Sequence, residues 1–177
     1  MKRSLYIICL LFFALSARGV DYVTTTHNFN DSVVAGTLTF QNYDYHIGTM
    51  TYDGTVYTCM GAHGIFKSVE TLNYNIYIYL QQSDSVIISF TKGQLSHFSL
   101  SYINFTGTIR IFVSSDGTTW TEKDPVTSTS TTTEVTGLNG EKYIKIKNTS
   151  DPNKTLYISR MVYYTIPPCH CLRVVSE

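Results

Sequence analysis

The chain of 177 residues is predicted to be an all-β protein, because its composition favours strands over helices. Threonine and serine together account for 42 residues and tyrosine for 14, whereas only Ala35 and Ala62 supply alanine after residue 19. β-Branched and aromatic side chains fit a pleated, half-buried surface. The content of 43% hydrophobic and 15% charged residues also allows a sizeable core, which argues against a disordered chain.

Residues 1–19 have the pattern of a secretory signal peptide. Lys2 and Arg3 form a basic start, residues 5–15 are apolar, and the segment ends in Ala17-Arg18-Gly19. This run is too short to span a membrane, and no second long apolar run follows, so we expect no transmembrane segment. We expect export to a periplasmic, cell-surface or extracellular location.

Cleavage at that point would change the charge of the protein. The full chain carries 13 basic and 13 acidic residues, and the leader holds three of the basic ones. Residues 20–177 therefore keep 10 basic against 13 acidic residues, a net charge of −3. A nucleic-acid partner is not expected for such a chain.

Alternation with a period of two then marks the strands in order. Residues 109–113 alternate between aliphatic side chains and Arg110 or Phe112, and residues 144–147 alternate isoleucine with lysine. About ten short strands without a helical period predict an antiparallel β-sandwich, a jelly roll. Further strands are expected near residues 22–29, 34–40, 47–52, 55–60, 74–80, 85–91, 95–103, 129–136 and 155–165.

Three dipeptides predict hairpin turns, namely Asp53-Gly54, Asp116-Gly117 and Asn139-Gly140. The seven hydroxyl residues 127–133 are expected to form a strand with a wet face rather than a linker, because too few residues follow for a second core. The sequence thus predicts one sandwich domain over residues 20–165 and a C-terminal tail over residues 166–177.

A family resemblance enters in the second half of the chain. Residues 109–120 read IRIFVSSDGTTW, residues 141–146 read EKYIKI, and residues 156–164 read LYISRMVYY. This pattern resembles the galactose-binding-domain-like jelly rolls, which include discoidin-type and carbohydrate-binding modules, as in small secreted Bacteroidetes proteins. The resemblance covers about a third of the chain. It implies a sandwich that binds carbohydrate, and a structural calcium held by backbone oxygens would leave no signature here. Ser159-Arg160 departs from the family, which often has an acidic residue at this point.

The single tryptophan follows the Asp116-Gly117 turn. We expect Trp120 to re-enter the sheet as a large buried anchor rather than to form an exposed surface for sugar stacking.

Catalytic signatures are missing from the sequence. There is no G-x-S-x-G motif, and the carboxylates are scattered along turns, so no catalytic residue is assigned. We expect a protein that is not an enzyme, with a small secreted hydrolase as the least favoured alternative.

The cysteines leave two alternatives open. Cys59, His63 and Cys169-His170-Cys171 could supply a zinc site, but C-x-C is not the spacing of common structural sites. A disulfide from Cys59 to Cys169 or Cys171, or no pairing, is favoured for an exported chain. No metal ligand and no cofactor are assigned.

Two places could bind a polysaccharide or glycan, because sugar sites combine exposed aromatic rings with polar side chains. One is a polar loop with two aromatic residues, and the other is the Asn/Tyr face of the strand at 73–80. A structural or adhesive surface protein that makes protein contacts is the alternative, and the sequence does not define an oligomeric state. The predicted ligand-binding residues are Tyr43, Asp44, Tyr45, His46, Asn75, Tyr77 and Tyr79.

Glycan attachment is a further expectation that depends on the host. N-x-S/T sequons begin at Asn30, Asn104, Asn148 and Asn153, and in a eukaryotic secretory protein they would mark surface positions.

Overall fold

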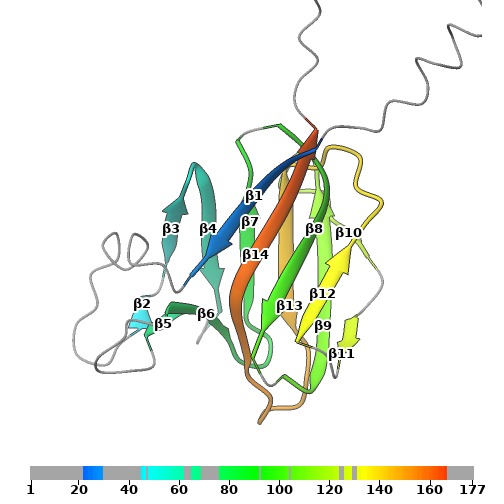
Figure 1. Ribbon diagram of the computed structural model, residues 1–177. Helices are drawn as coiled ribbons and strands as arrows, with labels where there is room; N and C mark the ends of the chain where they lie inside the picture. The colour runs from blue at the N-terminus through cyan, green and yellow to red at the C-terminus, as the bar shows by residue number, and fades with distance from the viewer. Residues whose placement is uncertain are drawn as a thin grey trace, which may run out of the picture.

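The computed structural model of the chain shows an antiparallel β-sandwich (Figure 1). The residues it describes form 14 strands in two sheets of seven strands each, and no helix. The all-β jelly-roll prediction is therefore confirmed. No helix in this part of the chain is long and apolar enough to cross a membrane. The described residues are 22–29, 45–46, 48–61, 65–68, 76–91, 93–103, 105–123, 126–128 and 131–166.

Sheet A has the strand order β12-β8-β14-β6-β5-β2, and β1 also pairs with β14. β8 pairs with β14 along most of its length, whereas β6 and β1 share the other edge of β14. β14 therefore lies at the centre of this sheet. Its strands are β1 (Val23–Asn28), β2 (Tyr45–His46), β5 (Ile65–Ser68), β6 (Ile76–Leu80), β8 (Gln94–Tyr102), β12 (Thr132–Val135) and β14 (Leu156–Ile166).

Sheet B has the order β10-β9-β13-β7-β4-β3, and β11 also pairs with β9. All of its pairs are antiparallel. Its strands are β3 (Thr49–Tyr52), β4 (Thr55–Met60), β7 (Ser85–Ser89), β9 (Gly107–Ser114), β10 (Thr121–Glu122), β11 (Val126–Ser128) and β13 (Tyr143–Asn148).

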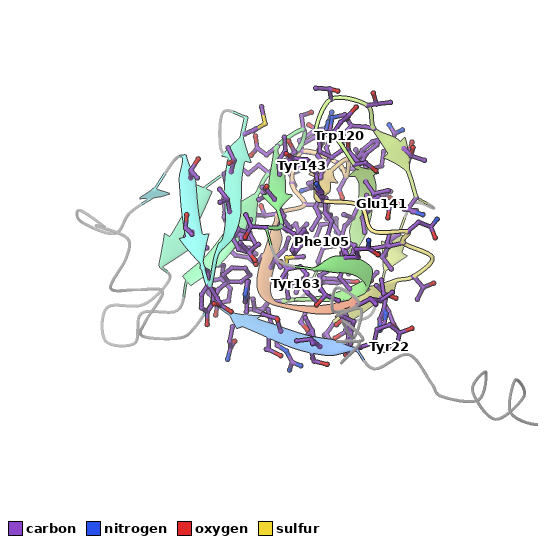
Figure 2. The ribbon with its side chains drawn as sticks, turned by 90° about the horizontal axis from the view of Figure 1, so that it is seen from above. Tyr22, Phe105, Trp120, Glu141, Tyr143 and Tyr163 are labelled. Carbon is purple, nitrogen blue, oxygen red and sulfur yellow. The ribbon has the colours of Figure 1, made fainter. Side chains whose placement is uncertain are left out.

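The period of two determines which side chains enter the core between the sheets. In β9 the three aliphatic residues at 109, 111 and 113 are buried, while Arg110 is exposed and Phe112 is half-buried. In β13 Ile144 and Ile146 are buried, as the alternation with lysine predicted. Phe105 and Tyr163 lie in the interior between the two sheets (Figure 2).

Two of the three predicted hairpin turns are confirmed. Asp53 and Gly54 both have positive φ, 45° and 76°, and connect β3 to β4. These dihedrals belong to the turn that best matches the twist of paired strands. Asp116-Gly117 lies between β9 and β10, which pair with each other.

The hairpin predicted at Asn139-Gly140 is wrong. These residues lie between β12 in sheet A and β13 in sheet B, so the chain changes sheets at this point. The Gly140 amide donates to the carbonyl of Leu95, 3.1 Å away, which holds the connection against β8. A dipeptide specifies the local turn geometry, but the sheet that receives the next strand depends on distant residues.

The hydroxyl-rich run at 127–133 does not form one strand either. It begins in β11, which pairs with β9 in sheet B, and it ends in β12, which pairs with β8 in sheet A. The expected strand at 129–136 is thus shortened to Thr132–Val135, and Thr132 is exposed there. The described parts of this run thus pair with strands of both sheets.

Trp120 is not the buried anchor that the sequence predicted. It is half-buried and does not belong to the core between the sheets. Its ring lies on the outer side of sheet B, where the Lys145 ammonium sits 4.1 Å from the ring centroid. Tyr57, Phe98 and Tyr163 supply the large buried rings instead.

One of the four sequons falls inside the fold. Asn148 is 0% exposed, so its side chain is not at the surface position that a glycan requires. Asn153 is exposed, whereas Asn30 and Asn104 lie outside the described residues. Residues 1–19, the expected strand at 34–40, and residues 167–177 of the predicted tail also lie outside them.

Candidate functional site

The tyrosines predicted on β6 point away from the core, but their rings are covered. Ile78 and Leu80 face the core, and Tyr77 and Tyr79 occupy the opposite face with only 8% of each residue exposed. Both rings pack edge-on against Tyr157, with centroids 6.1 Å and 5.1 Å apart. The prediction that both tyrosines lie on the face opposite the aliphatic residues is correct, but their rings do not form the expected open surface for stacking. Ligand binding by Tyr77 and Tyr79 remains a prediction.

The loop predicted at residues 43–46 is only partly described. Tyr45 and His46 form β2, which pairs with β5 at the edge of sheet A opposite β12. Tyr43, Asp44 and Asn75 lie outside the described residues. Their role in binding a ligand also remains a prediction.

A more open aromatic cluster lies on the outer face of sheet A, and we call Tyr22, His97 and Tyr164 the Tyr22 cluster. The His97 and Tyr164 rings are stacked, with centroids 4.0 Å apart and planes inclined by 10°. Tyr22 meets His97 edge-on at 5.1 Å and is 45% exposed. Glu134 on β12 extends the cluster, because its carboxylate lies 3.9 Å from Nε2 of His97.

Strand register brings this cluster together. β8 sends Phe98 and Leu100 into the core, so His97 and Ser99 face outward. Tyr164 lies opposite His97 in the same register that pairs Tyr163 with Phe98, and a register shift follows directly after this pair, with Ser96 of β8 as the extra residue. Such a shift marks a β-bulge, which changes the direction of side chains along a strand. The outer face continues past the cluster with small hydroxyl residues, since Ser99 and Ser101 lie opposite Val162 and Arg160.

The sequence analysis did not identify the Tyr22 cluster. The alternation in residues 95–102 and the adjacent tyrosines at 163 and 164 were signals that one ring of the pair faces outward. Which outward residues meet depends on the β8–β14 register and its bulge. A single strand pattern does not contain that information.

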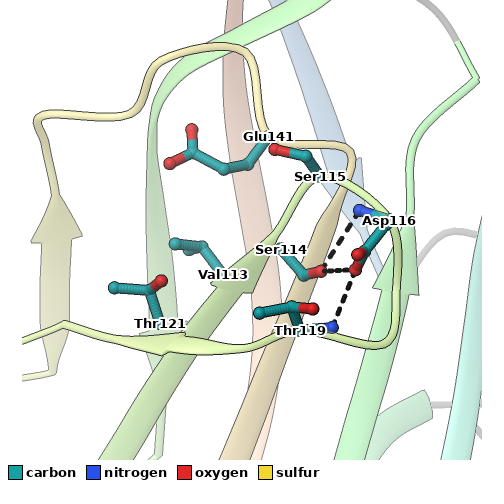
Figure 3. A pocket seen from close by; sticks show the side chains of 7 residues that line it. All are labelled: Val113, Ser114, Ser115, Asp116, Thr119, Thr121 and Glu141. Atoms are coloured by element: carbon teal, nitrogen blue, oxygen red, sulfur yellow. Dashed lines mark hydrogen bonds between the residues drawn. The ribbon is translucent and has the colours of Figure 1, made fainter.

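A small pocket of about 190 Å³ opens at the β9–β10 turn (Figure 3). Asp116 shapes this turn, because its carboxylate accepts hydrogen bonds from the backbone amides of Thr118 and Thr119, each at 2.8 Å. The Ser114 hydroxyl donates to the same carboxylate oxygen at 2.9 Å. The lining residues are Val113, Ser114, Ser115, Asp116, Thr119, Thr121 and Glu141.

The chemistry of the pocket does not favour catalysis. The hydrogen bonds from Thr119, Thr118 and Ser114 hold the pKa of Asp116 well below its ordinary value, so the carboxylate is a weak base. Glu141 accepts a hydrogen bond from the backbone amide of Asn139. Both carboxylates of the pocket are therefore engaged in holding turns of the chain.

Cys59 lies on β4 with its side chain buried in the core, and it has no disulfide partner among the described residues. Burial raises the pKa of this thiol well above its ordinary value, and the charge of Asp84 raises it further. Among the described residues no three His, Cys, Asp or Glu side chains lie together as metal ligands. Because neither candidate disulfide partner is described, the pairing of Cys59 remains a prediction. His63, Cys169 and Cys171 lie outside the described residues.

No family model matches the chain, and no curated protein matches its sequence. Comparison with solved structures gives similarities in fold. A family 29 fucosidase from Ruminococcus gnavus, solved with fucose, superposes with a TM-score of 0.50 and 12% identity over 65% of this chain. The match spans 26% of the fucosidase chain.

Two isolated modules are also similar. The family 32 carbohydrate-binding module of Clostridium perfringens NanJ, in complex with galactose, has a TM-score of 0.47 and 14% identity, over 62% of this chain and 93% of the module. An F5/8 type C domain from Bacteroides fragilis has a TM-score of 0.48 and 12% identity, over 68% of this chain and 97% of that domain. The fucosidase match at a TM-score of 0.50 is a similarity of fold alone, and it agrees with the antiparallel β-sandwich that the two sheets form.

Proposed function

We propose that the protein is an exported, noncatalytic carbohydrate-binding module that acts alone or beside enzymes of polysaccharide breakdown. The Tyr22 cluster carries this proposal. It offers an exposed tyrosine ring next to a stacked His97–Tyr164 pair, and Glu134 supplies an acceptor at its edge. Sugars bind to such surfaces through stacking on aromatic rings and hydrogen bonds to hydroxyl groups.

The surroundings of the cluster also favour a sugar ligand. The adjoining outward positions on β8 are Ser99 and Ser101, and Thr24 lies opposite Tyr164 on β1. Because these side chains are short, a ligand can approach the outer face of the sheet closely, and their hydroxyl groups can donate and accept hydrogen bonds. The pattern of residues 1–19 supports export.

A noncatalytic role agrees with the state of the described carboxylates. Asp116 and Glu141 hold turns, and Glu122 is bound by the Arg110 guanidinium through two N–H groups. A glycosidase needs two carboxyl groups that face each other across a bond, with at least one raised in pKa. The pKa of Asp116 moves in the opposite direction.

A glycan array and pull-downs on insoluble polysaccharides test the proposal, with protein that starts at residue 20. We expect at least one ligand, and Tyr22→Ala and Tyr164→Ala should each weaken its binding about tenfold, or about 1.4 kcal/mol. Met60→Ala, which removes an exposed apolar side chain from sheet B, is the matched control. Thermal unfolding should show that all three variants are folded.

Three results would overturn parts of the proposal. Absence of binding to every glycan would remove the carbohydrate function and favour a structural or adhesive protein. If binding is unchanged in Tyr22→Ala and Tyr164→Ala but lost in a Tyr77→Ala, Tyr79→Ala double variant, the binding site lies on β6 instead. Release of reducing ends from any polysaccharide would contradict the noncatalytic assignment.

A further inference from the structure

The outer face of sheet B carries a different set of side chains, which we call the basic face: Arg110, Phe112, Trp120, Glu122, Lys145 and Lys147. It lies on the other side of the sandwich from the Tyr22 cluster, since Trp120 and Tyr22 are on opposite sides of the molecule (Figure 2). β9 and β13 form it. Their inward residues fill the core, so the alternate residues point outward.

Cations oppose each other on this face. The register pairs Arg110 with Lys147 and Phe112 with Lys145 across β9 and β13. Like charges directly opposite on neighbouring strands destabilise a sheet. Among the described residues of this face, the one ion pair joins Arg110 to Glu122, so three cations share one carboxylate. The whole chain, in contrast, has equal numbers of basic and acidic residues.

Aromatic rings hold two of these cations, Lys145 and Arg110, in place. The Lys145 ammonium lies 4.1 Å from the Trp120 ring centroid and 5.6 Å from that of Phe112. The Arg110 guanidinium lies 5.2 Å from the Phe112 centroid on the same face. A cation over an aromatic ring is attracted by the ring's electrons, which orders a side chain that is otherwise mobile.

The rings themselves remain partly accessible. Trp120 and Phe112 are both half-buried, and neither belongs to the core between the sheets. The face therefore combines flat apolar surface with fixed positive charge. Lys145 and Lys147 are separated by one residue on β13, which places them about 7 Å apart along the strand. Arg110 lies on the adjacent strand, about 5 Å away.

We propose that the basic face is a second binding site, which takes an anionic polysaccharide whose sugars carry carboxylate or sulfate groups. The sugar rings pack against Trp120 and Phe112, and the anionic groups pair with Lys145 and Lys147. A bound anion relieves the repulsion between Lys147 and Arg110. Nucleic acid fits less well, because the net charge of residues 20–177 is negative.

The test uses protein from residue 20 and three immobilised or titrated probes. Polygalacturonate carries carboxylates, dextran sulfate carries sulfates, and dextran is the uncharged match to the latter. We expect both anionic probes to bind and dextran to bind at least about tenfold more weakly. Binding should weaken further in about 0.5 M NaCl, where exposed charges are screened.

Matched variants assign the site. A Lys145→Gln, Lys147→Gln double variant should bind the anionic probes at least about tenfold more weakly. A Lys142→Gln, Lys154→Gln double variant changes the net charge equally at exposed positions elsewhere, and it should stay within about twofold of the parent. Equal losses in the two double variants would overturn the proposal, because they would show a general charge effect.

Two further arms separate this proposal from other outcomes. Tyr164→Ala should leave the anionic probes bound as before, so failure at the Tyr22 cluster and failure here give different patterns. Duplex DNA that binds as tightly as polygalacturonate, with the same loss in the lysine variant, would show nonspecific attraction of polyanions and overturn a sugar site.

Discussion

The hydroxyl oxygens of Tyr57 and Tyr163 lie 2.6 Å apart in the interior and join the two sheets. Tyr57 comes from β4 of sheet B and Tyr163 from β14 of sheet A, and both are fully buried. Nδ1 of His27 on β1 lies 2.5 Å from the Tyr57 hydroxyl. Burial raises the pKa of both tyrosines, so both hydroxyls stay protonated and able to donate.

Because the two hydroxyls share a hydrogen bond, the effects of removing them on the free energy of unfolding should be coupled. We expect Tyr57→Phe and Tyr163→Phe each to lower the free energy of unfolding by about 1–3 kcal/mol, because each leaves a buried hydroxyl with one partner fewer. The double variant should lose less than the sum of the two. Chemical denaturation measures all four proteins, and strictly additive losses would contradict a shared hydrogen bond.

The stability of the fold should depend on the side-chain amide of Asn148. Nδ2 donates to the carbonyls of Leu80 at 2.9 Å and Lys154 at 2.7 Å, while Oδ1 accepts from the Ser150 amide at 3.0 Å. In Asn148→Asp a carboxylate oxygen would face both carbonyls. We expect it to lower the free energy of unfolding by more than about 2 kcal/mol at pH near 7.

The pH dependence of that variant provides its control. Burial and the facing carbonyls should raise the pKa of the introduced carboxyl in the folded state, and protonation would restore a donor. The deficit should therefore shrink as the pH is lowered from about 7 to about 5. A deficit that stays constant over this range would show that charge at position 148 is not the cause.

Asp116 should contribute to stability only while it is ionised. Its folded pKa lies below the ordinary value of about 3.9, so its contribution is full above about pH 5 and is lost as the pH falls below about 4. Asp116→Ala should lower the Tm at neutral pH, and the difference from the parent should narrow in acid. Asp151→Ala, at another exposed carboxylate, should show little change at either pH.

The sequence was sufficient for most strands because alternation is local. Residues 55–60 and 109–113 form strands as predicted, since their buried side chains repeat every second residue. It was not sufficient at Asn139-Gly140, where the turn dipeptide is followed by a strand of the other sheet. The prediction that Trp120 is buried was wrong for a related reason, because its ring contacts Lys145, which lies on a strand 25 residues later in the sequence.

The candidate site was harder to predict than the fold. The alternation placed Tyr77 and Tyr79 on the correct face, but Tyr157 from a distant strand covers their rings. The Tyr22 cluster joins β8 and β14 with the residue before β1, and it depends on the register in which β8 pairs with β14. Surface patches in a sandwich are assembled from several strands, so no single segment displays them.

The central position of β14 also determines when sheet A can assemble during synthesis of the chain. Val23 pairs with Thr165, 142 positions later, and β6 and β8 depend on the same last strand. During synthesis these three strands leave the ribosome before β14, which joins them, so the centre of sheet A can assemble only after β14 has been made. Contacts between such distant residues form slowly. Nascent chains shorter than about 166 residues would leave the outer face of sheet A, and with it the Tyr22 cluster, unformed.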